Sequence, residues 1–180
     1  MVSSSADGKT WSAVTRIPID ATTSTVDHFL PGIGADPATS GPSGHLTIVC
    51  YYYPDTNCSV STCRLNIGFT TSTDGGATWT AGTKIGGPMK VSWLPVSDNG
   101  PMVADYIGVS YSNGNPFGVF AGALAPSGAT LNEAMAESAR GISPRAAHRS
   151  GRETLASSGS CHPKEGCRLP SRQGVPPVVR

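Results

Sequence analysis

One short sequence occurs twice in this chain of 180 residues. Residues 4–11 read SSADGKTW and residues 72–79 read STDGGATW, so the two tryptophans, Trp11 and Trp79, are 68 residues apart. Each copy is followed by a short β-like run, and the repeated unit is therefore a turn plus a strand. A repeat of this length restricts the chain to folds that are built from similar supersecondary units.

Between Phe29 and Ile85 the sequence predicts four strands in meander order. Residues 29–35 end in an Asp-Pro turn, and residues 45–53 form a nearly continuous β-branched and aromatic run, as in a strand buried on both faces. Residues 64–70 alternate apolar and polar side chains, which is typical of a half-buried strand. The second copy of the repeat lies at the tip of the hairpin that follows.

After a Gly-Gly-Pro turn the pattern starts again, with two strands predicted at 105–111 and 117–121. Gly (22 residues) and Pro (15 residues) are frequent, and charged residues make up only 14% of the chain. This composition favours short strands joined by turns. Four-stranded units of roughly 40 to 70 residues, each with a turn motif, are typical of a β-propeller.

The repeated turn resembles the Asp-box, or BNR repeat, whose pattern is Ser-x-Asp-x-Gly-x-x-Trp. The second copy matches every defining position, namely Ser72, Asp74, Gly76 and Trp79. The first copy has Ala6 in place of the Asp and keeps Ser4, Gly8 and Trp11. The motif is structural: Asp74 should accept backbone hydrogen bonds within the turn, and Trp79 should cover the hairpin. Asp74 is therefore not expected to be a catalytic acid.

The resemblance implies an all-β fragment, a partial propeller of about two blades of four-stranded antiparallel meanders from a six-bladed, sialidase-like parent. The predicted layout has four parts: the outer strands of one blade with the degraded Asp-box at 1–20, a complete blade at 27–87, the inner strands of a further blade at 101–125, and a disordered basic tail at 131–180. The tail has no aromatic residue and little apolar surface. A shifted reading frame from about Met135 would explain its composition; a basic tail that binds an acidic partner is the alternative.

The net charge of the chain also changes sign towards the predicted tail. Residues 1–139 hold five basic and ten acidic residues, a net charge of −5, and residues 140–180 hold eight basic and two acidic residues, a net charge of +6. The net charge of +1 therefore says little about partners. Nucleic-acid binding is not expected, because the first part is acidic and the tail lacks aromatic residues that stack on bases. No apolar run is long enough for a membrane helix, and the first residues do not predict a signal peptide.

Sialidase-like enzymes bind the substrate carboxylate with three arginines and use a Tyr activated by a Glu as nucleophile, with an Asp as acid/base. Before Arg140 this chain has only Arg16 and Arg64, and no Glu precedes Glu133. We therefore expect a fragment of a glycoside-hydrolase-type propeller that is not catalytically competent alone. The alternative is a non-catalytic propeller module that binds a glycan or a protein.

The remaining site candidates lie where innermost strands begin or end. Asp105 and Tyr106 are weak catalytic candidates, and Asp27, His28 and Asp36 are weak ligand-binding candidates. Each also has a structural interpretation, as a turn residue or a packed blade edge. The expected partners are a carbohydrate for the parent protein and the missing blades of the parent propeller.

Cysteine use indicates the compartment. Cys58 and Cys63 are close enough in one predicted loop to form a disulfide, which suggests an extracellular or periplasmic parent protein. No cofactor and no metal site are expected, because no Cys pair has the Cys-x-x-Cys spacing of zinc sites. Cys50, in the buried run, is expected to be a core residue.

Overall fold

The computed structural model describes residues 1–138, which form antiparallel β-sheets and contain no α-helix. The first sheet has four strands in the order β1-β2-β3-β4. These are β1 (Asp27–Ala35), β2 (Leu46–Tyr53), β3 (Arg64–Ser72) and β4 (Thr83–Lys90). Each strand pairs with the next one along the chain, so the predicted four-stranded meander is confirmed.

A second sheet has three strands in the order β7-β8-β9. These are β7 (Gly108–Ser112), β8 (Asn115–Ser127) and β9 (Thr130–Glu137). The connection from β4 contains a short 3-10 helix, η2 (Val91–Trp93), and a small hairpin of β5 (Val96–Ser97) and β6 (Gly100–Pro101). Another 3-10 helix, η1 (Gly41–Ser43), lies between β1 and β2.

Strand β9 corrects the prediction of a disordered tail from residue 131. Its backbone pairs with β8 from Leu124↔Asn132 to Val119↔Glu137, and Gly128, at a φ of 60°, lies in the turn between the strands. The prediction was wrong here because it weighed side-chain composition, whereas β9 is held by the backbone ladder along a long neighbouring strand. The rest of that predicted tail, 139–180, and the basic-partner hypothesis attached to it lie outside the described residues.

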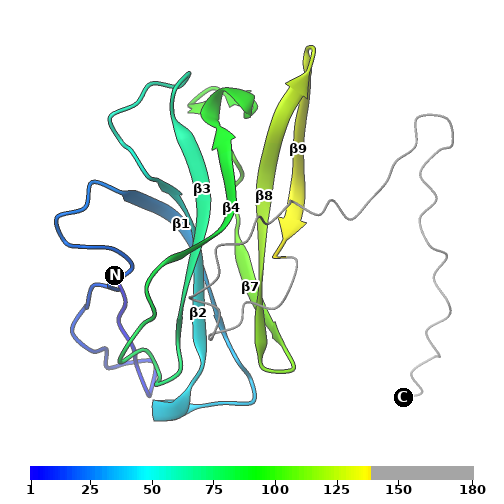
Figure 1. Ribbon diagram of the computed structural model, residues 1–180. Coiled ribbons are helices and arrows are strands. Elements are labelled where there is room, and N and C mark those ends of the chain that lie inside the picture. The colour runs from blue at the N-terminus through cyan, green and yellow to red at the C-terminus, as the bar shows by residue number, and fades with distance from the viewer. Residues whose placement is uncertain (139–180) are drawn as a thin grey trace, which may run out of the picture.

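The two sheets pack face to face around one core (Figure 1). The face of β2 and β3 that carries Val49, Tyr51 and Ile67 is fully buried, and Phe120 of β8 lies on the same core. A Cβ on Gly118 of β8 would lie 2.9 Å from the side chain of Val49, so the backbone of β8 runs directly over β2. Apolar burial of this kind is the main stabilising contribution to the fold.

Strands β1 and β7 run parallel at close range, although they belong to different sheets. Gly32 lies against Ile107 and Gly34 against Val109, so residue numbers increase in the same direction on both strands. A Cβ on Gly32 would lie 2.6 Å from the carbonyl oxygen of Ile107, a distance that no side chain could accept. Glycine is therefore required for this contact.

The N-terminal segment, residues 1–26, covers the opposite face of the four-stranded sheet. The backbone N–H of Gly82, just before β4, donates a hydrogen bond to the carbonyl of Ile19 in this segment (3.3 Å). Figure 1 shows the four-stranded sheet between this segment and the sheet β7–β9. The sequence predicted outer strands in 1–20, but the structure has a loose hairpin closed by the isolated bridge Val2↔Thr15. Its serines supply much of the pairing, since Ser3 Oγ donates to the carbonyl of Ser12 (2.8 Å).

Candidate functional site

The turn at residues 72–79 joins β3 to β4 and is closed by its own side chains. Ser72 Oγ donates to Asp74 Oδ1 (2.8 Å), and the N–H of Gly76 donates back to Ser72 Oγ (2.9 Å). The carboxylate of Asp74 also accepts from the hydroxyl and the backbone N–H of Thr78. These donors, led by the Thr78 hydroxyl, lower the pKa of Asp74 from 3.8 to about 2. Asp74 is thus held as an anion and has no proton to give at neutral pH.

The apolar side chain of this turn is anchored as well. Trp79 is half-buried, and its Nε1–H donates to the carbonyl of Gly76 (3.0 Å). Gly75 and Gly76 adopt φ values of 68° and 92°, which side chains with a Cβ rarely accept. The turn therefore needs glycine at both positions.

The first copy of the turn uses different residues from those predicted. Asp7 accepts from the N–H groups of Thr10 and Lys9 (both 2.8 Å), and Ser5 Oγ donates to Asp7 Oδ1 (3.0 Å). Ser5 thus stands where Ser72 stands in the second copy, and the prediction of Ser4 was wrong. The alignment on the tryptophans hid this because the first turn is one residue shorter. Hydrogen bonds from Thr10, Lys9 and Ser5 lower the pKa of Asp7 to about 2.

Four of the candidate residues lie where β1 and β7 begin. Asp27 and His28 start β1, and Asp105 and Tyr106 come just before β7, outside the strand in which they were predicted. Because β1 and β7 are parallel, the four residues lie at the same end of the two strands. Within residues 1–138 no hydrogen bond or ion pair joins them, and Tyr106 is 85% exposed. Asp27, Asp105 and Tyr106 are exposed, whereas His28 lines a pocket on the outer face of the four-stranded sheet, so the four residues do not form an assembled catalytic site.

Asp36 lies at the opposite end of β1 and is separate from the other candidates. It is buried, accepts a hydrogen bond from the N–H of Ala38 (3.0 Å), and lies 3.8 Å from Nδ1 of His45. The N–H of Thr39 donates to its carbonyl (3.0 Å). This pattern closes the turn after β1, and it corresponds to the structural interpretation of Asp36.

The arginines do not converge in the described part of the chain. The guanidinium of Arg16 forms an ion pair with the carboxylate of Asp20 and donates to the carbonyl oxygens of Asp20 (2.9 Å) and Ala21 (3.3 Å). Arg64 is exposed at the start of β3. Arg16 thus closes its own loop and is not free to bind a substrate carboxylate there.

The charge of Glu133 acts on Tyr51, a relation between a glutamate and a tyrosine that the sequence did not indicate. Burial, and then the charge of Glu133, raise the pKa of Tyr51 to about 12. The Tyr51 hydroxyl is fully buried and bonded to the backbone of Ala121 as donor and as acceptor (both 2.9 Å). A phenol with a raised pKa and both hydrogen-bonding functions in use is not an activated nucleophile.

The predicted disulfide is confirmed, because Cys58 and Cys63 are bonded to each other in the loop between β2 and β3. This pairing removes both thiols as metal ligands. Cys50 is a free, buried thiol, and burial raises its pKa to about 11. No group of three His, Cys, Asp or Glu side chains in residues 1–138 is arranged to hold a metal ion.

Comparison with known proteins adds no assignment: no family of proteins, no curated protein and no solved structure matches the chain. No helix in the described part is long and apolar enough to cross a membrane. The function must therefore be argued from the sheets, the turns and the exposed strand ends.

Proposed function

We propose that this chain is a fragment of a sialidase-like Asp-box propeller, of glycoside-hydrolase ancestry, that contacts carbohydrate and does not hydrolyse it alone. The observation that carries the proposal is the parallel, glycine-mediated contact of β1 with β7. In a propeller each blade is a meander that starts at the central axis, so the first strands of successive blades are parallel neighbours. The turn between β3 and β4, with Asp74 and Trp79, lies at the position that an Asp-box occupies in a blade.

We expect no turnover because residues 1–138 do not assemble the groups that hydrolysis needs. A sialidase-like mechanism needs three converging arginines, a tyrosine nucleophile activated by a glutamate, and a protonated acid. Arg16 is engaged by Asp20, Tyr51 is inaccessible, and Asp74 is held ionised. Carbohydrate contact is assigned to the open surface where β1 and β7 begin, because the exposed ring of Tyr106 offers an apolar face with a polar edge.

Two assays on the full chain test the two halves of this proposal. With a fluorogenic sialoside we expect no release of fluorophore above the buffer rate. With immobilised sialylated and neutral oligosaccharides we expect weak, saturable binding that Tyr106→Ala abolishes and Trp11→Ala leaves unchanged. Trp11 is the matched control because it is also an exposed aromatic residue but lies in the N-terminal segment. Turnover would refute the non-catalytic part, and equal binding by both variants would refute the assigned surface.

A further inference from the structure

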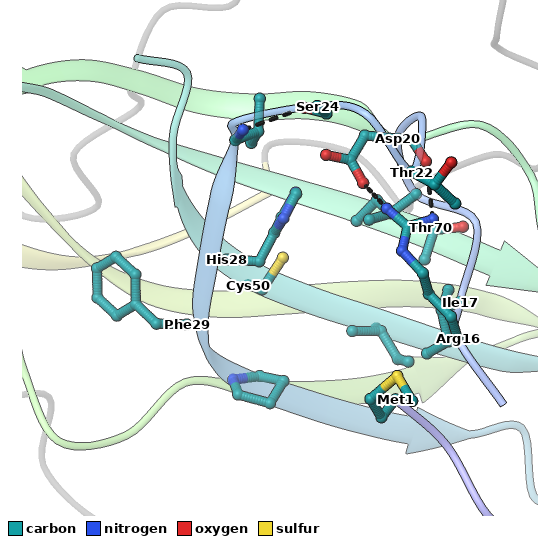
Figure 2. Close-up of a pocket in the computed structure, with 14 residues that line it drawn as sticks. Met1, Arg16, Ile17, Asp20, Thr22, Ser24, His28, Phe29, Cys50 and Thr70 are labelled. Carbon is teal, nitrogen blue, oxygen red and sulfur yellow. Dashed lines mark hydrogen bonds and ion pairs between the residues drawn. The ribbon is translucent and has the colours of Figure 1, made fainter. Parts of the chain in front are cut away.

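A pocket of about 460 Å³ lies between the N-terminal segment and the four-stranded sheet, on the face away from β7–β9. Its floor is made by β1, β2 and β3, through residues that include His28, Ile48, Cys50 and Thr70. Residues 16–26 form its rim (Figure 2). Its volume is within the range of pockets that hold small organic molecules. Asp27, Asp105 and Tyr106 are not among its lining residues, so a ligand bound here is independent of carbohydrate contact at the open surface.

Most polar groups around this pocket are already paired within the protein. The guanidinium of Arg16 is bound by Asp20, so the two charges on the rim compensate each other. Thr70 Oγ1 donates to the carbonyl of Thr80 (2.6 Å), and Ser24 Oγ accepts from the N–H of Val26 (3.1 Å). The side chains of residues 16–26 and of the floor therefore offer no unpaired guanidinium, ammonium or carboxylate group, and an ionic ligand bound against them would lose its hydration without gaining a counter-charge.

The surface left for a ligand is apolar with one polar ring. Ile17, Ile19 and Ile48 and the neutral thiol of Cys50 supply apolar contact. The ring of His28 makes no hydrogen bond within residues 1–138 and lies beside Cys50 in Figure 2, stacked on Tyr52 at 5.7 Å. An imidazole nitrogen can accept or donate one hydrogen bond, according to its protonation.

We propose that this pocket is a binding site for a small, neutral, mainly apolar molecule, such as an aromatic ring system, which carries a single hydrogen-bonding group directed at His28. The cavity limits the size and shape of the ligand. The ion pair of Arg16 with Asp20 favours a neutral ligand, and a hydrogen bond to His28 fixes the orientation of the ligand. The N-terminal segment thereby acquires a role of its own, because it forms the rim that converts an open sheet face into a pocket.

Indole and indene, which share one bicyclic shape, form a sharp pair of probes for the full chain. Only indole has an N–H group. Ligand-observed NMR titrations should give saturable binding of both, with indole about two- to tenfold tighter, the range for one net hydrogen bond. His28→Phe keeps an aromatic ring on Tyr52 and should abolish that preference while both probes still bind.

A second variant tests the location. Ile48→Trp should fill the floor of the pocket and weaken both probes by about tenfold or more. Val96→Trp is the control, because Val96 is 80% exposed on the distant hairpin β5–β6 and the new side chain has the same size. Circular dichroism would check that each variant folds; should Ile48→Trp fail to fold, the His28→Phe comparison still decides.

The proposal is overturned if neither probe binds saturably to the folded chain. Equal affinities of the two probes for the wild type would remove the role of His28 and with it the proposed ligand class. Binding unaffected by a folded Ile48→Trp variant would place the probes elsewhere. None of these results bears on the sialoside and oligosaccharide assays, so the two proposals fail independently.

Discussion

Replacing Tyr51 by phenylalanine tests how the two sheets are joined. Ala121 lies in β8 beyond Val119, where the pairing of β7 with β8 ends, so its N–H and C=O have no strand partner on that side. The Tyr51 hydroxyl takes the place of the missing strand: it donates to the Ala121 carbonyl and accepts from the Ala121 N–H, both at 2.9 Å. Tyr51→Phe keeps the ring and removes only these two bonds.

The expected loss follows from the burial of both partners. Tyr51 is completely inaccessible and Ala121 is 4% exposed, so water cannot replace the hydroxyl without a rearrangement of the core. An unsatisfied buried donor or acceptor costs about 1–3 kcal/mol, and two such groups with partial relaxation give about 2–4 kcal/mol. That is a large part of the 5–15 kcal/mol typical of a folded domain.

Urea unfolding followed by tryptophan fluorescence, at one fixed protein concentration, measures this change. Tyr53→Phe is the matched control, because Tyr53 lies two residues along the same strand, is half-buried and makes no hydrogen bond through its hydroxyl within the described residues. We expect it to change stability by less than about 0.5 kcal/mol. If Tyr51→Phe lost no more than Tyr53→Phe, the hydroxyl bridge would not be what holds β8 against β2.

Three further predictions concern the turns and the loop. The pKa of Asp74 is lowered by folding, so the stabilisation from its ionised form is complete above about pH 4 and is lost as the pH falls towards 2. Asp74→Asn should therefore flatten the pH dependence of the melting temperature over that window. It should also lower the melting temperature at pH 7 more than Asp7→Asn does, since the second turn joins two strands of the four-stranded sheet. Replacing both cysteines of the Cys58–Cys63 disulfide by serine should lower the free energy of unfolding by about 2 kcal/mol, and dithiothreitol should reproduce this in the wild type only. Gly32→Ala should cost about 1–3 kcal/mol in urea unfolding, because its Cβ meets the backbone of the next sheet, whereas Gly108→Ala, with open space around it, should be nearly neutral.

The four-stranded meander was predictable because its signals are local. Alternation in β3, the β-branched and aromatic run of β2 and the Asp-Pro turn at Asp36 each identify one element without reference to the rest of the chain. The alternation was wrong about burial, because Leu65–Ser72 is buried on both faces and β3 is not half-buried. The failures come where stability is supplied from a distance. Strand β9 depends on the ladder offered by β8, and Tyr51 depends on a backbone partner 70 residues away, which no pattern of side chains reports.

The candidate site was predictable only in part, for the same reason. The position of Asp27 at the start of an innermost strand follows from strand order, which the sequence indicates, whereas Asp105 lies just before β7 and not in the strand predicted for it. The pocket over Cys50 does not, because it exists only where residues 16–26 return to the outer face of the sheet. That return is set by contacts such as the one between Ile19 and Gly82, in a segment without a clear apolar period.

The two Asp turns show why the repeated motif marks a unit of folding and not a site. Asp7 and Asp74 have the same lowered pKa of about 2 and the same class of donors, yet Trp11 is 61% exposed and Trp79 is half-buried. The hydrogen bonds therefore close within one turn, whatever the surroundings. A motif that is complete in itself has no free group for a ligand. The functional information must therefore lie outside the turns, at the strand ends near Tyr106 and on the face that carries Cys50.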